Sequence, residues 1–272
     1  MKNHALMRCA LTLTVMLFGA AALTSDPAFA SCADIDAAVT GTVHAALSTA
    51  LNNALAPAVG LNNEMWGTIV DRDGIVCAVA FTGASRGDQW PGSRVISAQK
   101  ANTANAFSRP NNVMGFDAPL STANLWAATQ PGGSLFGLQE SNPVDPAVAY
   151  GGSAADYGTA SDFMVGKKIG GINVFGGGLA LYSGTVAAST LLGALGVSGD
   201  TSCADHIIAW RVRDALNLDA VPGGVAGGTD NIIFDVTGSH GNFQSKGGFG
   251  HPQCGFGERP IAEALPSSNP IE

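Results

Sequence analysis

The chain has little charge, and it lacks several of the patterns that would assign a function directly. Only 12% of its 272 residues are charged, and the formal net charge is −8 at pH 7. A basic surface for nucleic acid phosphates is therefore missing, and nucleic acid is not expected as a partner. Beyond residue 30, no segment has the roughly 18 uninterrupted apolar residues of a membrane span. No H-E-x-x-H helix and no P-loop occur, so the corresponding zinc-protease and nucleotide-binding signatures are absent.

Residues 1–30 have the pattern of a secretory signal. Lys2 and Arg8 precede a nearly continuous apolar run over 9–23, and Ala28-Phe29-Ala30 forms a small-x-small cleavage site. We therefore expect residues 31–272 to form a single domain that is periplasmic or secreted. Without the segment the chain keeps 11 basic and 20 acidic residues, a net charge of −9.

Four cysteines remain after this cleavage, and an even number in an exported chain favours disulfides. They are Cys32, Cys77, Cys203 and Cys254. The count by itself leaves all three pairings open. Buried free thiols are the alternative.

The order of periodic segments predicts an α+β domain with a mostly antiparallel sheet covered by helices. Asp73-Gly74 between two β-type runs is a strong hairpin signal. A long insertion at about 109–169 and an extended C-terminal arm at about 219–272 interrupt the pattern. The expected helices span 32–55, 93–107 and a segment from 202 onward, and the expected strands span 66–71, 75–81, 170–174, 179–182 and 185–197.

One stretch combines a strand, a tight turn and a helix start. The turn Ser198-Gly199-Asp200-Thr201 leads into the helix, whose first free backbone N–H groups can hold an anion. Ser202 with Asp205 has the spacing of a capping box, although Asp200 or Thr201 could equally cap. Cys203 and His206 lie in the first turn of this helix.

The preceding helix carries a mixed stripe of residues. Ile96, Lys100, Thr103 and Phe107 fall on one face at helical spacing. Lys100 on that stripe could reach a pocket. Alternatively, it could extend to solvent or pair with an acidic neighbour.

Three blocks of the chain resemble the GlcG/HbpS-type family of small haem-binding proteins. They are the hairpin DRDGIVCAVAFTG (71–83), the helix SAQKANTANAFS (97–108) and GGINVF…LGALGVSGD (170–200). The resemblance covers about half of residues 31–272 and identifies the chain as a longer, exported member. It implies a profilin-like fold, homo-oligomers, and binding of haem or a related small molecule. Asn173 stands where family members commonly have proline.

Haem requires an apolar slot, an axial donor, and cationic or N–H groups for its propionates. The histidines that could ligate iron are His44, His206, His240 and His251, and His206 is the preferred one. The expected pocket lies between the Lys100 helix and the 199–206 helix start, partly covered by the insertion. Its expected ligand-binding residues are Lys100, Thr103, Gly199, Asp200 and His206.

A second pattern links the helix start to the arm. Cys203-x-x-His206 is mirrored by His251-x-x-Cys254. A Cys203–Cys254 disulfide would pin the arm to the helix and leave Cys32–Cys77 as the other pair, with His206 and His251 close enough to share a metal. The same four residues could instead form a Cys₂His₂ zinc site.

These observations favour haem sequestration or sensing. The alternatives are an enzyme that degrades haem or converts a small organic acid in the same pocket, and an oligomeric interaction module without a ligand. Binding is preferred to catalysis because the residues around the helix start form no catalytic constellation.

Overall fold

The computed structural model describes residues 29–55, 59–110, 119–238 and 241–272. Nearly all of the predicted signal segment, and His240, lie outside these described residues. Within the described ranges, no helix is both long and apolar enough to cross a membrane.

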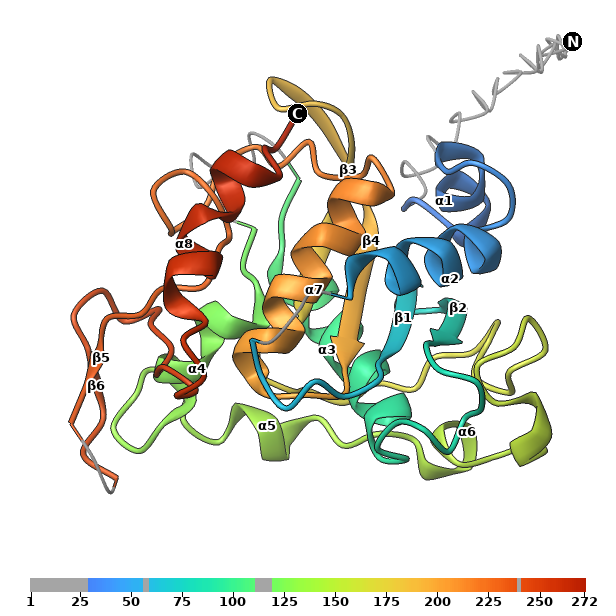
Figure 1. Ribbon diagram of the computed structural model, residues 1–272, viewed down its shortest axis with the longest axis horizontal. Coiled ribbons are helices and arrows are strands. Elements are labelled where there is room, and N and C mark those ends of the chain that lie inside the picture. Colours follow the sequence, from blue (N-terminus) through green and yellow to red (C-terminus); the bar gives the residue numbers. More distant parts are fainter. Residues whose placement is uncertain (1–28, 56–58, 111–118, 239–240) are drawn as a thin grey trace, which may run out of the picture.

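A four-stranded antiparallel sheet in the order β2-β1-β4-β3 forms the centre of the fold (Figure 1). The strands are β1 (Trp66–Asp71), β2 (Val76–Phe81), β3 (Gly178–Thr185) and β4 (Ala188–Ser198). The predicted β1–β2 hairpin is confirmed, and Gly74 takes the left-handed conformation that its turn requires. Strand β4 begins at Ala188 rather than at residue 185, because Thr185 is the last residue of β3 and residues 186–187 form the hairpin turn.

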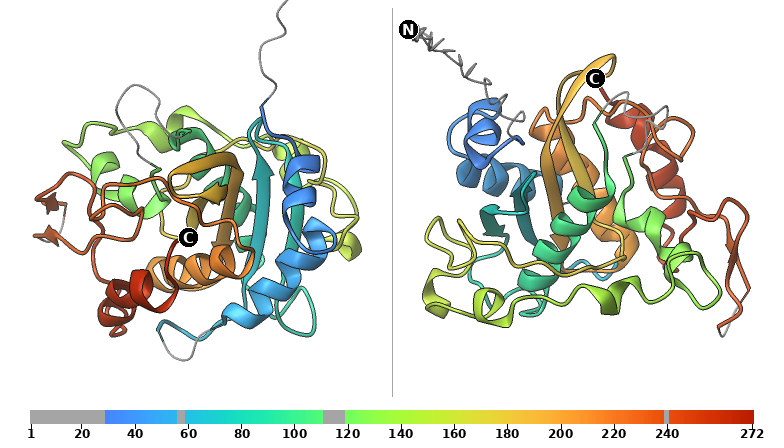
Figure 2. Two further views of the ribbon diagram at one scale, coloured as in Figure 1. Left: turned by 90° about the horizontal axis from the view of Figure 1, so that it is seen from above. Right: turned by 180° about the vertical axis from the view of Figure 1, so that it is seen from behind.

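Helices cover both faces of the sheet, as Figure 2 shows. Helix α3 (Ser93–Phe107), which has the predicted bounds, packs on one face, and α2 (Val43–Ala54) and α7 (Ser202–Ala215) pack on the other. Side chains of β4 alternate accordingly: Leu195 packs with the α2–α7 core, and Ala194 packs with the α3 core. Gly196 lets α3 approach closely, because a Cβ there would overlap the Ser97 carbonyl oxygen.

The first predicted helix is two helices rather than one. Helix α1 (Cys32–Ala38) ends before α2 begins at Val43. Gly41 in the intervening turn has φ +83°, a value that a continuous right-handed helix excludes. The prediction of a single helix over 32–55 was therefore wrong.

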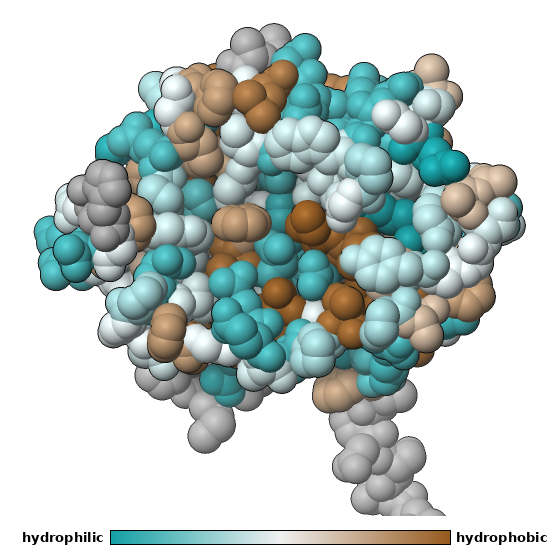
Figure 3. All heavy atoms as spheres, turned by 90° about the horizontal axis from the view of Figure 1, so that it is seen from below, coloured by the Kyte–Doolittle hydropathy of each residue, from teal (hydrophilic) through white to brown (hydrophobic). Residues whose placement is uncertain are grey.

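The insertion consists of short helical turns joined by loops. They are η1 (Thr122–Leu125), α4 (Trp126–Thr129), α5 (Leu138–Ser141), α6 (Pro146–Ala149) and η2 (Ala154–Asp156). The segment predicted as a strand at 170–174 is not one; Gly170 makes only an isolated bridge to Val144. On the face of the molecule seen from below in Figure 3, apolar residues gather in the middle and hydrophilic residues surround them.

The C-terminal arm is not wholly extended, which corrects the prediction. It contains the short hairpin β5 (Val236–Thr237) and β6 (Gln244–Ser245) and then helix α8 (Arg259–Ser268). Ala262 and Leu265 on α8 are buried in the core that includes α7. The arm is therefore part of the folded domain.

Candidate functional site

The predicted helix start is present, and Thr201 caps it. The Thr201 hydroxyl accepts a hydrogen bond from Ala204 N, so α7 begins without the Ser202–Asp205 capping box. The Asp200 carboxylate accepts hydrogen bonds from the backbone N–H groups of Leu61 and Asn63, at 2.8 and 3.0 Å. Asp200 therefore fixes the 61–63 loop against the turn.

Lys100 and Asp205 form a buried ion pair at the end of β4. The Lys100 Nζ atom lies 2.6 Å from Asp205 Oδ2 and 3.0 Å from Val197 O, and both side chains are almost fully buried. Burial raises the pKa of the Asp205 carboxyl to about 6 and lowers the pKa of Lys100. Of the alternatives for Lys100, the structure has the pairing with an acidic neighbour, and this pair occupies the region where the pocket was expected.

Thr103 and Gly199 also have intramolecular roles. The Thr103 hydroxyl donates to Gln99 O and accepts from Asn173 N at 2.9 Å. The proline common in the family at position 173 would lack this N–H, so Asn173 makes a hydrogen bond that proline cannot make. A Cβ on Gly199 would crowd Met65. Ligand binding by these residues stays a prediction.

His206 is fully buried under the arm. Its Nε2 atom lies 3.0 Å from Asn231 Oδ1 and 3.1 Å from Ile232 N, and among the described residues its Nδ1 atom has no hydrogen-bond partner. Burial lowers the pKa of His206 to about 4, so the imidazole is neutral at pH 7. His44 lies elsewhere, with Nε2 3.2 Å from Gly158 O.

Both disulfides of the favoured pairing are present, Cys32–Cys77 and Cys203–Cys254. His251 lies beside the second, with Nδ1 4.0 Å from Cys203 Sγ. The structure does not bring His206 into this cluster, because the His206 ring contacts the 231–232 segment. The four-residue Cys₂His₂ site is therefore not assembled.

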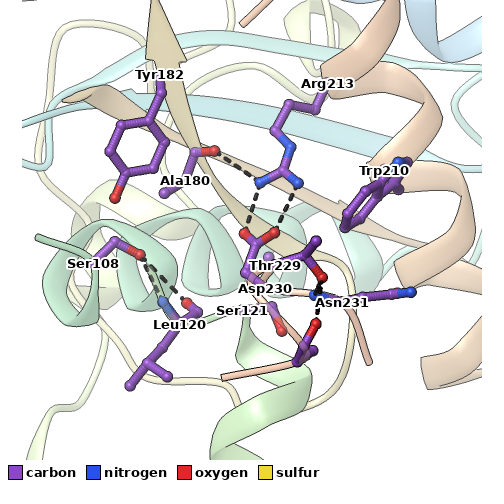
Figure 4. Close-up of polar contacts among 12 residues, drawn as sticks. Ser108, Leu120, Ser121, Ala180, Tyr182, Trp210, Arg213, Thr229, Asp230 and Asn231 are labelled. Atoms are coloured by element: carbon purple, nitrogen blue, oxygen red, sulfur yellow. Dashed lines mark hydrogen bonds and ion pairs between the residues drawn. The ribbon is translucent and has the colours of Figure 1, made fainter. Parts of the chain in front are cut away.

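A buried ion pair that sequence reasoning missed holds the arm on α7. Arg213 donates to both carboxylate oxygens of Asp230, at 2.7 and 2.8 Å, and both side chains are fully buried. Figure 4 shows the two groups facing one another, with Tyr182 beside them. The Tyr182 hydroxyl donates to Arg109 O at the start of the insertion. No sequence signal identified Asp230 as the partner of Arg213.

A cleft with aromatic walls opens at the N-terminal end of α3, with a volume of about 280 Å³. We call it the aromatic cleft. Its lining joins β1, the loop before α3, α3 itself and the insertion, through Trp66, Arg86, Pro91, Gly92, Arg94, Val95, Tyr150 and Tyr157. Among the described residues, the cavities with volumes of about 160 to 480 Å³ include this cleft, and none of these cavities is lined by Lys100, Thr103 or His206.

Charge at the aromatic cleft comes from two arginines. Arg94 is buried and bound to Asp162 through Nε and Nη2, and its guanidinium lies 3.7 Å from the centre of the Tyr157 ring. It thereby holds Tyr157 in place. Arg86 is exposed and lines the cleft. Aromatic walls with a guanidinium suit a flat, anionic ligand.

The sequence contained weak signals for this cleft. The polar loop over 83–92 carries the exposed Arg86 and the half-exposed Trp90. Residues 83–87 also read G-A-S-R-G, the letters of a nucleophile elbow. The structure excludes an elbow there, because no helix follows directly and Ser85 Oγ donates to Asp88.

The architecture is that of an α+β domain in which an antiparallel sheet is flanked by helices. Residues 42–213 match the family described as "Haem degrading protein HbpS-like", and the chain belongs to this family. A comparison with curated proteins gave no match.

Solved structures with similar folds include the Klebsiella pneumoniae protein ORFY, at 22% identity and a TM-score of 0.41, covering 64% of this chain and 89% of that one. A PduOC:heme complex shares 23% identity at a TM-score of 0.43, covering 66% and 97%. A double mutant of Streptomyces reticuli HbpS shares 14% identity at a TM-score of 0.40, covering 75% and 99%.

Proposed function

We propose that this chain is an exported haem-binding protein that sequesters or senses haem, and that haem binds at the aromatic cleft. Membership of the HbpS-like family supports the ligand class. The observation that carries the location is the combination of apolar aromatic walls with an exposed guanidinium in one cleft.

The residues of the cleft fit the chemical requirements of haem. The partly exposed Tyr157 and the exposed Tyr150 offer aromatic surface, the buried Trp66 forms the floor of the cleft, and Arg86 would pair with a propionate. The exposed Tyr150 would supply a phenolic oxygen, a ligand that haem iron accepts in proteins. A volume of about 280 Å³ is at the small end of ligand sites, so one edge of the porphyrin would insert. Bound haem would supply redox and oxygen chemistry.

The helix start fits haem less well. His206 is fully buried, and the Arg213–Asp230 pair and the Cys203–Cys254 disulfide hold the covering arm in place. Haem contact by His206 would require the arm to leave α7. The buried, unpartnered Nδ1 atom of His206 is the feature that favours this second location.

Titration with haemin tests the proposal, because a bound haem gives a Soret band distinct from that of free haemin. We expect saturable binding by the chain over residues 31–272. Arg86→Ala and Tyr150→Phe are expected to weaken it about tenfold each, while the exposed control Arg259→Ala leaves it unchanged. The absence of any spectral change with haemin would refute haem binding. Loss of binding in His206→Gln alone would move the site to the helix start.

Degradation of haem is the second candidate function, favoured by the description of the family. An enzyme would lose the Soret band over time with a reductant or peroxide, and a passive carrier would keep it. Conversion of a small organic acid would instead appear as consumption of the acid, inhibited by haemin if both bind at the cleft. An interaction module would show neither behaviour and would keep a stable homo-oligomer by light scattering.

Export is the remaining part of the proposal. Residues 1–30 have the signal pattern, and two disulfides suit an oxidising compartment. Fractionation of expressing cells followed by N-terminal sequencing tests it. A mature protein beginning at Ser31 in the periplasm or medium is expected, and an intact Met1 in the cytoplasm would refute it.

A further inference from the structure

The Cys203–Cys254 disulfide lies against a potential metal ligand. Cys203 Sγ, Cys254 Sγ and one ring nitrogen of His251 all lie within 4.8 Å of one another. Cys203 and His251 are buried, and Cys254 is half-buried. Two sulfurs and an imidazole nitrogen are the ligand types that zinc prefers in proteins.

We propose that reduction of this disulfide creates a binding site for a thiophilic divalent cation of the zinc class, held by Cys203, Cys254 and His251. The disulfide form does not offer the thiolates that the cation needs. The site is therefore redox-controlled, and it is independent of haem binding at the aromatic cleft.

The distances suit tetrahedral zinc. Zn–S bonds of about 2.3 Å and Zn–N bonds of about 2.0 Å separate sulfur and nitrogen by roughly 3.6 Å. Cys203 Sγ and His251 Nδ1 are already 4.0 Å apart. A small movement within the buried cluster therefore completes the contact. Three protein ligands leave the fourth tetrahedral position to a water molecule.

The second ring nitrogen of His251 is already positioned by Ser202. The Nε2 atom lies 2.7 Å from Ser202 Oγ, which in turn accepts from Gly176 N at 2.6 Å. A metal-bound histidine is usually oriented by a hydrogen bond from its other nitrogen. His251 Nδ1 currently lies 2.6 Å from Pro252 O, so metal binding replaces that contact.

The helix start favours the thiolate of Cys203 and the sulfur of Cys254. Cys203 lies in the first turn of the 14-residue helix α7, where the helix dipole favours negative charge. The backbone N–H of Cys203 also donates to Cys254 Sγ at 3.2 Å. Both the helix dipole and this N–H are backbone features of α7, so they do not depend on the S–S bond itself.

The chemistry balances with a thiol-class reductant. A dithiol gives two electrons and two protons to the S–S bond, becomes a disulfide itself, and leaves two Cys thiols. The cation then displaces both thiol protons to solvent. His251 stays neutral, and its proton moves from Nδ1 to Nε2, where it is donated to Ser202 Oγ.

A second cluster could also bind the metal, so the experiment must exclude its contribution. Cys32, Asp71 and Cys77 also lie within 4.8 Å of one another, around the other disulfide. The test therefore uses the Cys32→Ser/Cys77→Ser variant, reduced with a phosphine and titrated with Co²⁺, whose thiolate complexes absorb in the near ultraviolet. We expect a thiolate–cobalt band that Zn²⁺ displaces and that the oxidised protein lacks.

Substitutions then identify the ligands. His251→Gln and Cys254→Ser should each lower Co²⁺ affinity more than tenfold, and Ser202→Ala about tenfold. An absent band, or a band that neither ligand substitution weakens, would overturn the proposal.

Alkylation of the reduced wild type avoids dependence on the folding of any variant. Zn²⁺ should slow the modification of Cys203 and Cys254 at least tenfold and leave Cys32 and Cys77 unprotected. Equal rates at Cys203 and Cys254 with and without Zn²⁺ would contradict the site, whereas protection confined to Cys32 and Cys77 would assign the metal to the other cluster.

Discussion

Lys100 on α3 lies 2.6 Å from Asp205 on α7, so a single buried ion pair joins helices that pack on opposite faces of the sheet. The Lys100 ammonium also donates to Val197 O near the end of β4. Lys100, one of the residues expected to bind a ligand, thus connects three elements of the fold. These positions therefore contribute to the stability of the fold.

Removing one partner of this pair should destabilise the protein strongly. Lys100→Met leaves the Asp205 carboxylate buried without its counter-charge, which typically costs about 3–5 kcal/mol. The double variant Lys100→Met/Asp205→Leu should recover most of this loss, because no unpaired charge remains. Urea unfolding of the four proteins in the cycle measures both effects. A cost below about 1 kcal/mol for Lys100→Met would mean that the pair is open to water.

We expect the difference in the free energy of unfolding between wild type and His206→Gln to depend on pH. Burial lowers the pKa of His206 from 6.5 to about 4, so folding opposes its protonation. Its contribution to the free energy of unfolding is complete above pH 6.5 and is lost as the pH falls toward 4, by up to about 3 kcal/mol. Glutamine does not titrate. Unfolding curves of both proteins between pH 7 and 4 should converge by that amount, and a constant gap would contradict a buried neutral histidine.

Gly158 should tolerate no side chain, and Gly132 supplies the matched control. Both have positive φ, +76° and +85°, but a Cβ on Gly158 would overlap the Phe81 ring and approach Trp66, whereas Gly132 has open space. Gly132→Ala should cost about 1–2 kcal/mol from backbone strain alone. Gly158→Ala should cost clearly more and should also weaken haemin binding, because Trp66 lines the aromatic cleft. Equal losses of stability in the two variants would show that the Trp66 and Phe81 side chains move aside without strain.

The Cys32–Cys77 disulfide should contribute substantially to stability. It joins residues 45 positions apart, and the chain-entropy estimate for such a loop is about 4 kcal/mol. Cys32→Ala/Cys77→Ala should lower the free energy of unfolding by about 2–4 kcal/mol under oxidising conditions. With a reductant present, wild type and variant should become similar, and a difference that persists would have to come from side-chain packing.

Sequence reasoning succeeded where the determining interactions are local or patterned. Asp73-Gly74 identified the β1–β2 hairpin, and α3 has the predicted bounds. The mirrored Cys203 and Cys254 motifs led to the disulfide pairing that the structure contains. Turn chemistry, helical periodicity and motif symmetry are all properties of short stretches, so one sequence is enough to read them.

The aromatic cleft depends on contacts between distant segments, and these cannot be predicted from any short stretch of sequence. Trp66, Arg86 and Tyr150 meet in the aromatic cleft only because the insertion folds back over the start of α3. The pairing of Arg213 with Asp230, and with it the burial of α7 under the arm, likewise needs the folded chain.

The sequence by itself thus determined the sheet hairpin, the main helices and the family resemblance. Only the tertiary structure decided that His206 and Lys100 are internal and that a cleft opens elsewhere. The physical reason is that burial depends on which distant segment covers a side chain, and a residue's own neighbours in sequence do not specify that segment.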